Sequence, residues 1–168
     1  MPRLQIAVFG EGDLAGDPRG ERLADLAYGV GRGLGRAGAV LVCGGRGGVM
    51  EAACRGARDA GGETLGILPG DRRAGPAPNP HLTHEVYAGV GQGRNLAVAL
   101  SGRAAIAVGG SWGTLSEIAL ALRHGVPVVT LASWTPERPD GWPEPGLHRA
   151  QDADGAVRLA LDLATAEP

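Results

Sequence analysis

Lysine is absent from this sequence, and all sixteen basic residues are arginine. A Walker A loop is therefore excluded, because that loop needs a lysine to reach the outer phosphates of a nucleotide. An enzyme that holds pyridoxal phosphate as a Schiff base on its own lysine is excluded for the same reason.

The sequence also has only two cysteines and a low net charge. The two cysteines, Cys43 and Cys54, lie outside any CxxC pattern and have no histidine nearby, so we expect two buried thiols rather than a disulfide framework or a zinc site. The four histidines show no metal-ligand spacing, and we expect no bound metal. A net charge of −2 lacks the basic surface of a general nucleic-acid binder, so no nucleic-acid partner is expected.

Long hydrophobic runs are missing too. No stretch of the 168 residues has the length or the flanks of a signal peptide or a membrane span. We therefore expect a cytoplasmic protein without a membrane partner. A chain of this length predicts one domain over residues 1–168.

Short aliphatic runs alternate with amphipathic helical stretches along the chain. This order predicts an α/β fold, a single Rossmann-like doubly wound domain with a mainly parallel sheet. Pro69–Pro80 has four prolines in twelve residues and predicts a surface loop that can cover a ligand, and Ala132–Leu147 is an irregular segment rich in Pro and Trp. The expected strands are Leu4–Phe9, Val40–Cys43, Thr64–Leu68, Glu85–Tyr87, Ala104–Val108 and Val128–Leu131, and the expected helices are Glu21–Ala37, Val49–Ala60, Gly93–Leu100, Thr114–His124 and Asp154–Ala164.

Glycine-rich loops follow three of these strands, at the sheet edge where ligands bind in such folds. Two of the loops lead straight into helices, whose unpaired first-turn N–H groups and positive dipole end favour an anion, most often phosphate. Tight turns and close helix packing require glycine as well, so glycines alone do not establish an anion site. The two loops are Gly109-Gly110-Ser111-Trp112-Gly113-Thr114 and Gly44-Gly45-Arg46-Gly47-Gly48.

The third loop, after the first strand, contains Gly10, Gly12 and Ala15 in a GxGxxA pattern. The pattern alone would indicate a dinucleotide. A dinucleotide fold also needs an acidic residue after the second strand to hold the ribose, and Cys43-Gly44-Gly45 stands there instead. NAD or FAD is therefore not favoured, and Gly10 and Gly12 remain candidates for contact with a phosphorylated ligand.

Two charged residues near these loops are candidates for ligand chemistry. Arg94 either holds a phosphate or carboxylate through its guanidinium, with Asn95 as a second polar contact, or is a solvated residue near a helix start. Glu117 is either the far end of a capping box with Thr114 or an acid, base or hydrogen-bond acceptor for the ligand.

Other side chains near the loops have equally open roles. Arg46 either closes over a phosphate or is a mobile loop residue, and Trp112 either stacks on a ligand ring or makes a subunit contact. Helical periodicity predicts that the helix after Gly113 buries Leu115, Ile118, Ala119 and Leu122.

Taken together, these motifs resemble the Lonely Guy (LOG) superfamily, and within it the branch of molybdenum cofactor carrier proteins. LOG enzymes cleave the N-glycosidic bond of cytokinin riboside monophosphates with an Arg and the Glu of a PGGxGTxxE motif, and these match Arg94 and Glu117. Val108 replaces the Pro of those enzymes and Asn95 replaces a second basic residue, and the carrier branch has a valine and an Arg-Asn pair there. The resemblance runs from Leu4 to Leu131 and rests on the segments Gly44–Met50, Gly93–Asn95 and Gly109–Glu117.

This resemblance implies a binding protein for a phosphorylated heterocyclic small molecule. Molybdenum cofactor, an AMP-like nucleotide or phosphate itself is the expected ligand, and no other cofactor is required. Two alternatives stay open: a nucleoside 5′-monophosphate phosphoribohydrolase with Glu117 and Arg94 as catalytic residues, and an inactive nucleotide sensor. The resemblance also implies a homo-oligomer, a dimer or a tetramer. Some members of the superfamily are described as possible lysine decarboxylases. A chain without lysine cannot form the Schiff base with pyridoxal phosphate that such an enzyme uses.

Overall fold

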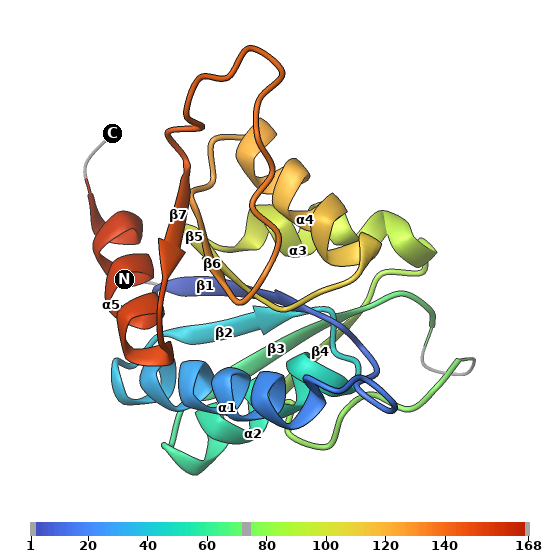
Figure 1. The fold of residues 1–168 in the computed structure, drawn as a ribbon. Coiled ribbons are helices and arrows are strands. Elements are labelled where there is room, and N and C mark those ends of the chain that lie inside the picture. The colour runs from blue at the N-terminus through green and yellow to red at the C-terminus, as the bar shows by residue number, and fades with distance from the viewer. Residues whose placement is uncertain (1–2, 72–74, 167–168) are drawn as a thin grey trace.

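One sheet of seven parallel strands runs through the protein, as shown by a computed structural model that describes residues 3–71 and 75–166 (Figure 1). The strands lie in the order β4-β3-β2-β1-β5-β6-β7, and each pairs in parallel with its neighbours. The strands are β1 Gln5–Gly10, β2 Val40–Cys43, β3 Glu63–Leu68, β4 His84–Tyr87, β5 Ala104–Val108, β6 Val128–Leu131 and β7 Leu147–Ala150. The predicted doubly wound α/β fold is confirmed.

Helices cover both faces of the sheet (Figure 1). The first group, α1, α2 and α5, packs on one face, and α3 and α4 pack together on the other. The helices are α1 Gly20–Arg36, α2 Gly48–Asp59, α3 Arg94–Ser101, α4 Trp112–Arg123 and α5 Ala153–Thr165, with a short 3₁₀ helix η1 at Gly91–Gly93. No helix in the described ranges is both long and apolar enough to cross a membrane.

The central strands are apolar on both faces because helices cover both. In β1, Ile6 and Val8 pack toward the α1 side, whereas Ala7 and Phe9 pack toward the α3 side, and all four are fully buried. Such continuous burial is typical of parallel strands. The chain order reverses at β1, because β2 to β4 extend to one side of it and β5 to β7 to the other. A ligand crevice is therefore expected between the carboxyl ends of β1 and β5.

Helices α1 and α2 approach each other through glycine. A Cβ placed on Gly31 of α1 would lie 1.8 Å from the carbonyl oxygen of Ala53, and one on Gly56 of α2 would lie 2.1 Å from that of Tyr28. Any larger side chain at these positions would force the two backbones apart.

All five predicted helices are present, and four of them begin within one residue of the predicted start, whereas one strand was not predicted. The strand that was not predicted is β7, which begins at Leu147, the last residue of the segment expected to be irregular. Its residues pair with β6 at the edge of the sheet. Helix α4 begins at Trp112, two residues before the predicted start. The loop from Pro69 to Pro80 contains no helix in its described part, and residues 72–74 lie outside the described residues.

Candidate ligand-binding cleft

A cleft of about 420 Å³ lies at the carboxyl edge of the sheet, beside the reversal point. The loops that follow β1, β2, β3, β4 and β5 and the N-terminal turns of α2, α3 and α4 supply its walls. The lining residues are Gly10, Glu11, Gly12, Asp13, Arg46, Met50, Pro69, Gln92, Arg94, Asn95, Ser111, Gly113, Thr114 and Glu117. A hollow of about 480 Å³ near the chain ends is larger, but both of its arginines already have partners. Arg3 pairs with Glu63 at 2.9 Å, and Arg103 donates to the Ala164 carbonyl oxygen. Among the described residues, the two buried side-chain polar atoms without a hydrogen-bond partner both belong to residues that line the 420 Å³ cleft.

Nine of the sixteen predicted site residues line this cleft, and seven lie behind or beside its walls. Trp112 and the six glycines 44, 45, 47, 48, 109 and 110 do not line it. The sequence reading missed Glu11, Asp13, Met50, Pro69 and Gln92. Glu11 and Asp13 alternate with the predicted site residues Gly10 and Gly12, and this position in the same loop could have indicated that they line the cleft.

Arg94 is the first residue of α3; it lines the cleft and is 8% exposed. Its Nη1 donates to Asn95 Oδ1 at 2.7 Å, whereas its Nε has no hydrogen-bond partner among the described residues. Burial lowers the pKa of Arg94, and the charge of Glu117 partly opposes this effect. A guanidinium remains ionised under these conditions. A buried N–H group without a partner costs about 1–3 kcal/mol, so this donor is suited to an anion that enters the cleft.

Gly44 makes room for this guanidinium. A Cβ at Gly44 would lie 3.1 Å from Nη2 of Arg94 and 3.1 Å from Sδ of Met50. The glycine therefore supports the cleft from behind, because it allows the β2–α2 loop to pass directly against the arginine.

The loop between β2 and α2 is tied down by its neighbours. The N–H of Val49 in the first turn of α2 donates to the Glu11 carbonyl oxygen at 2.9 Å, so this helix amide already has a protein partner. Asn79, in the proline-rich loop, donates through Nδ2 to the Arg46 carbonyl oxygen at 3.2 Å and through its backbone N–H to that of Gly45 at 3.1 Å. These bonds fix the loop that carries the Arg46 side chain into the cleft.

Thr114 and Glu117 do not form the predicted capping box. The N-cap of α4 is Ser111, so Thr114 already lies within the first turn of the helix, and its side chain makes no capping bond. Thr114 is 1% exposed, and its Oγ1 is the second buried polar atom in the described chain without a partner. Of the buried face predicted for α4, Ile118 is buried and Leu115 and Leu122 are half-buried, but Ala119 is exposed. The fully covered residues also include Thr114, Glu117 and Ala121.

Glu117 is 7% exposed, and its burial raises its pKa to about 8, although the charge of Arg94 opposes this rise. The carboxyl group is therefore mostly protonated at neutral pH. Within residues 3–71 and 75–166, no ion pair joins Glu117 to Arg94. The sequence reading treated these residues as a charged pair, whereas the structure places a neutral acid near a cation.

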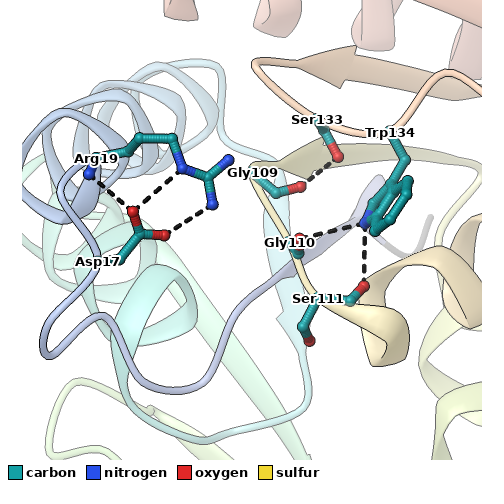
Figure 2. Close-up of polar contacts among 7 residues, drawn as sticks. All are labelled: Asp17, Arg19, Gly109, Gly110, Ser111, Ser133 and Trp134. Atoms are coloured by element: carbon teal, nitrogen blue, oxygen red, sulfur yellow. Dashed lines mark hydrogen bonds and ion pairs between the residues drawn. The ribbon is translucent and has the colours of Figure 1, made fainter.

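The loop from Gly109 to Ser111 is anchored by Ser133 and Trp134 in the segment that follows β6 (Figure 2). Nε1 of Trp134 donates to the carbonyl oxygens of Gly110 and Ser111 at 3.2 and 3.1 Å, and the Ser133 hydroxyl donates to that of Gly109. Trp112 is 76% exposed, and its ring centroid lies 5.3 Å from that of Trp134. These contacts hold the first turn of α4 in place, with its unpaired N–H groups at the cleft.

No cluster of three or more His, Cys, Asp or Glu side chains suited to a metal ion lies in the described parts of the chain. The cleft itself combines two arginines, the buried acid Glu117, the hydroxyls of Ser111 and Thr114 and the N-terminus of α4, with the acidic residues Glu11 and Asp13 on its β1 side. Such a set can hold an anionic group and hydrogen-bond a polar ring.

Comparison with known proteins agrees with this architecture. The SLOG cluster4 family profile matches residues 3–157, and the chain belongs to this family. An uncharacterized protein of Archaeoglobus fulgidus is 39% identical over 131 residues, which cover 78% of this chain and 82% of that protein.

Two solved structures resemble the whole chain. The molybdenum cofactor carrier protein of Chlamydomonas reinhardtii has a TM-score of 0.84 and 30% identity, covering 98% of this chain and all of that one. The molybdenum cofactor binding protein of Rippkaea orientalis has a TM-score of 0.82 and 30% identity, covering 98% and 99%. The resemblance to LOG-like Rossmann folds and to the carrier branch is thus confirmed.

Proposed function

We propose that this protein binds a phosphorylated heterocyclic small molecule of the molybdenum cofactor type in the cleft at the carboxyl edge of the sheet. The observation that carries the proposal is the pair of buried, unpartnered polar atoms, Arg94 Nε and Thr114 Oγ1. Both belong to residues that line the same cleft. The similarity to two cofactor-binding proteins over nearly the whole chain supports the same ligand class.

The cleft residues fit the two ends of such a ligand. Arg94 and the first turn of α4 supply donors for the phosphate, and the Thr114 hydroxyl supplies one more. The neutral carboxyl group of Glu117 can both donate and accept a hydrogen bond, which suits the polar edge of a heterocycle. A volume of about 420 Å³ lies in the range of about 300–1,000 Å³ that is usual for small-molecule sites.

Binding is tested by calorimetric titration with molybdenum cofactor and with AMP. Arg94→Ala removes the buried donors, and we expect its affinity to fall by about 1–3 kcal/mol, or roughly 5- to 150-fold. The matched control is Arg36→Ala, which removes an exposed arginine at the end of α1 and should leave affinity unchanged. Equal affinities for wild type and Arg94→Ala would remove Arg94 from the site.

One observation favours a second function, hydrolysis of the N-glycosidic bond of a nucleoside monophosphate. Such an enzyme needs an acid that is still protonated at neutral pH, and burial raises the pKa of Glu117 to about 8. Glu117 would then protonate the leaving base, with Arg94 holding the phosphate.

The two functions are separated by incubating the protein with AMP and an N6-substituted AMP and measuring free base by chromatography. Base released by wild type but not by Glu117→Gln would establish the hydrolase and overturn the binding proposal. Ligand affinity without base release, equal in wild type and Glu117→Gln, supports the binding protein, since glutamine keeps the shape and neutrality of the protonated acid.

A further inference from the structure

The two cysteines of the chain lie in contact beneath the cleft. Cys43 is the last residue of β2 and Cys54 lies on α2, and their Sγ atoms are 3.6 Å apart. Both side chains are fully buried, and neither lines the cleft. The backbone N–H of Gly45 also donates to Cys43 Sγ at 3.4 Å. The sequence predicted two buried thiols, but their contact follows only from the packing of α2 against β2.

We propose that Cys43 and Cys54 form a reversible disulfide when the protein meets a small peroxide, and that this bond changes the neighbouring cleft. The effect on the ligand rests on the proposed function, whereas formation of the bond does not. A disulfide is about 2.05 Å long, so the two sulfurs must approach each other by about 1.5 Å. The glycine-rich loop from Gly44 to Gly48 joins the two elements, so a movement of either one is passed to this loop.

The two thiols are suited to different roles in the reaction. The hydrogen bond from Cys54, together with that from the Gly45 N–H, lowers the pKa of Cys43. The hydrogen bond to Cys43 and burial raise the pKa of Cys54. Because the thiolate is the nucleophile in thiol oxidation, and the Gly45 N–H that donates to Cys43 Sγ at 3.4 Å stabilises a negative charge there, we assign Cys43 as the attacking thiol and Cys54 as the resolving thiol.

Hydrogen peroxide supplies the oxidant, and the atoms balance in two steps. Cys43 first loses its proton, and the resulting thiolate attacks one peroxide oxygen, the O–O bond breaks, and a sulfenic acid forms on Cys43. The released hydroxide takes up the proton that Cys43 lost and leaves as water. The Cys54 sulfur then attacks the Cys43 sulfur, the S–S bond forms, the S–O bond breaks, and a second water leaves with the Cys54 proton. Two thiols and one peroxide thus give one disulfide and two waters.

The cleft responds because Cys43 is bonded directly to Gly44. The backbone at Gly44 is so close to the Arg94 guanidinium and to Met50 that even a methyl group would lie 3.1 Å from each. A shift of roughly 1 Å at Cys43 therefore displaces one or both of these cleft residues, since a close-packed interior has no free volume to absorb it. We expect oxidation to weaken the affinity for AMP several-fold.

The first test detects the bond itself. The reduced, folded protein is treated with one equivalent of hydrogen peroxide, the peroxide is removed with catalase, and free thiols are labelled with N-ethylmaleimide in denaturant. Trypsin cleaves after Arg36, Arg46 and Arg55, so the peptides 37–46 and 47–55 each carry one cysteine. We expect no label and one linked pair of these peptides within a monomer, reversed by dithiothreitol. Two labels on the treated protein, or links only between different molecules, would overturn the proposal.

Single variants test the order of the reaction. Cys54→Ser should stop at a Cys43 sulfenic acid that dimedone traps, whereas Cys43→Ser should give little dimedone adduct. A stronger adduct on Cys54 in Cys43→Ser would contradict the assignment of Cys43 as the attacking thiol.

The second test measures AMP affinity before and after peroxide. Wild type should lose affinity and regain it with dithiothreitol, whereas the double variant Cys43→Ala/Cys54→Ala should not change. This control also detects direct oxidation of Met50, which would affect both proteins. A disulfide without a change in AMP affinity would overturn the coupling to the cleft. If reduced wild type binds no AMP, the proposed function fails while the peptide link still decides the disulfide.

Discussion

Replacement of Glu117 by glutamine should make the protein markedly less sensitive to alkaline pH. The pKa of this buried acid rises from an ordinary value of 4.5 to about 8. Between these two pH values the folded protein keeps a proton on Glu117 that the unfolded chain has lost. The folded state therefore binds more protons, and the free energy of unfolding falls as pH rises through this window.

The size of the effect follows from the pKa difference. At about 1.4 kcal/mol per pKa unit, a rise from 4.5 to about 8 corresponds to a loss on the order of 4–5 kcal/mol, complete above pH 8. Glutamine has the shape of the protonated acid and stays neutral at every pH. Glu117→Gln should therefore gain several kcal/mol relative to wild type between pH 5 and pH 9.

Urea unfolding of both proteins at pH 5, 7 and 9 measures this difference directly. All other titrating groups are common to the two proteins, so their contributions cancel in the comparison. Glu21→Gln, which changes an exposed carboxyl group in the first turn of α1, controls for removal of a surface charge. A stability difference between wild type and Glu117→Gln that does not change with pH would refute the burial of an acid at this position.

Three further predictions test the cleft and the packing behind it. Affinity of wild type for AMP should fall above pH 8, where Glu117 becomes anionic, and a parallel fall in Glu117→Gln would assign it to another group. Gly44→Ala places a methyl group against the guanidinium of Arg94 and should weaken AMP binding several-fold by calorimetry, whereas Gly93→Ala, whose Cβ would have only ordinary contacts at 3.6 Å or more, should not. Gly31→Ala should destabilise the fold by about 3 kcal/mol or more in urea, because its methyl group would lie 1.8 Å from a carbonyl oxygen; a cost below 1 kcal/mol would contradict this helix contact.

The order of the elements other than β7 could be predicted because each of them carries a local signal. Apolar runs such as Val40–Cys43, Ala104–Val108 and Val128–Leu131 end where the structure ends β2, β5 and β6. Strand β7 carries no such signal, since its four residues are only partly apolar and its pairing with β6 defines it.

The sequence also allowed several residues of the site to be predicted, but not the roles of those residues. Arg94, Asn95, Thr114 and Glu117 were chosen from loop position and family resemblance, and all four line the cleft. The spacing of Thr114 and Glu117 suggested a capping box, but α4 begins at Trp112, so Thr114 is not the N-cap residue. A local pattern cannot reveal this, because the start of a helix is decided by the loop contacts around it.

By itself the sequence determined an α/β domain with glycine loops at the carboxyl edge of its sheet and excluded lysine chemistry, because periodicity, turn residues and composition are local properties. Only the tertiary structure decided which polar atoms are buried without partners, that Glu117 is a neutral acid, and that Cys43 and Cys54 touch. These properties depend on desolvation and on contacts between residues far apart in the chain, and both arise only when the helices pack on the sheet.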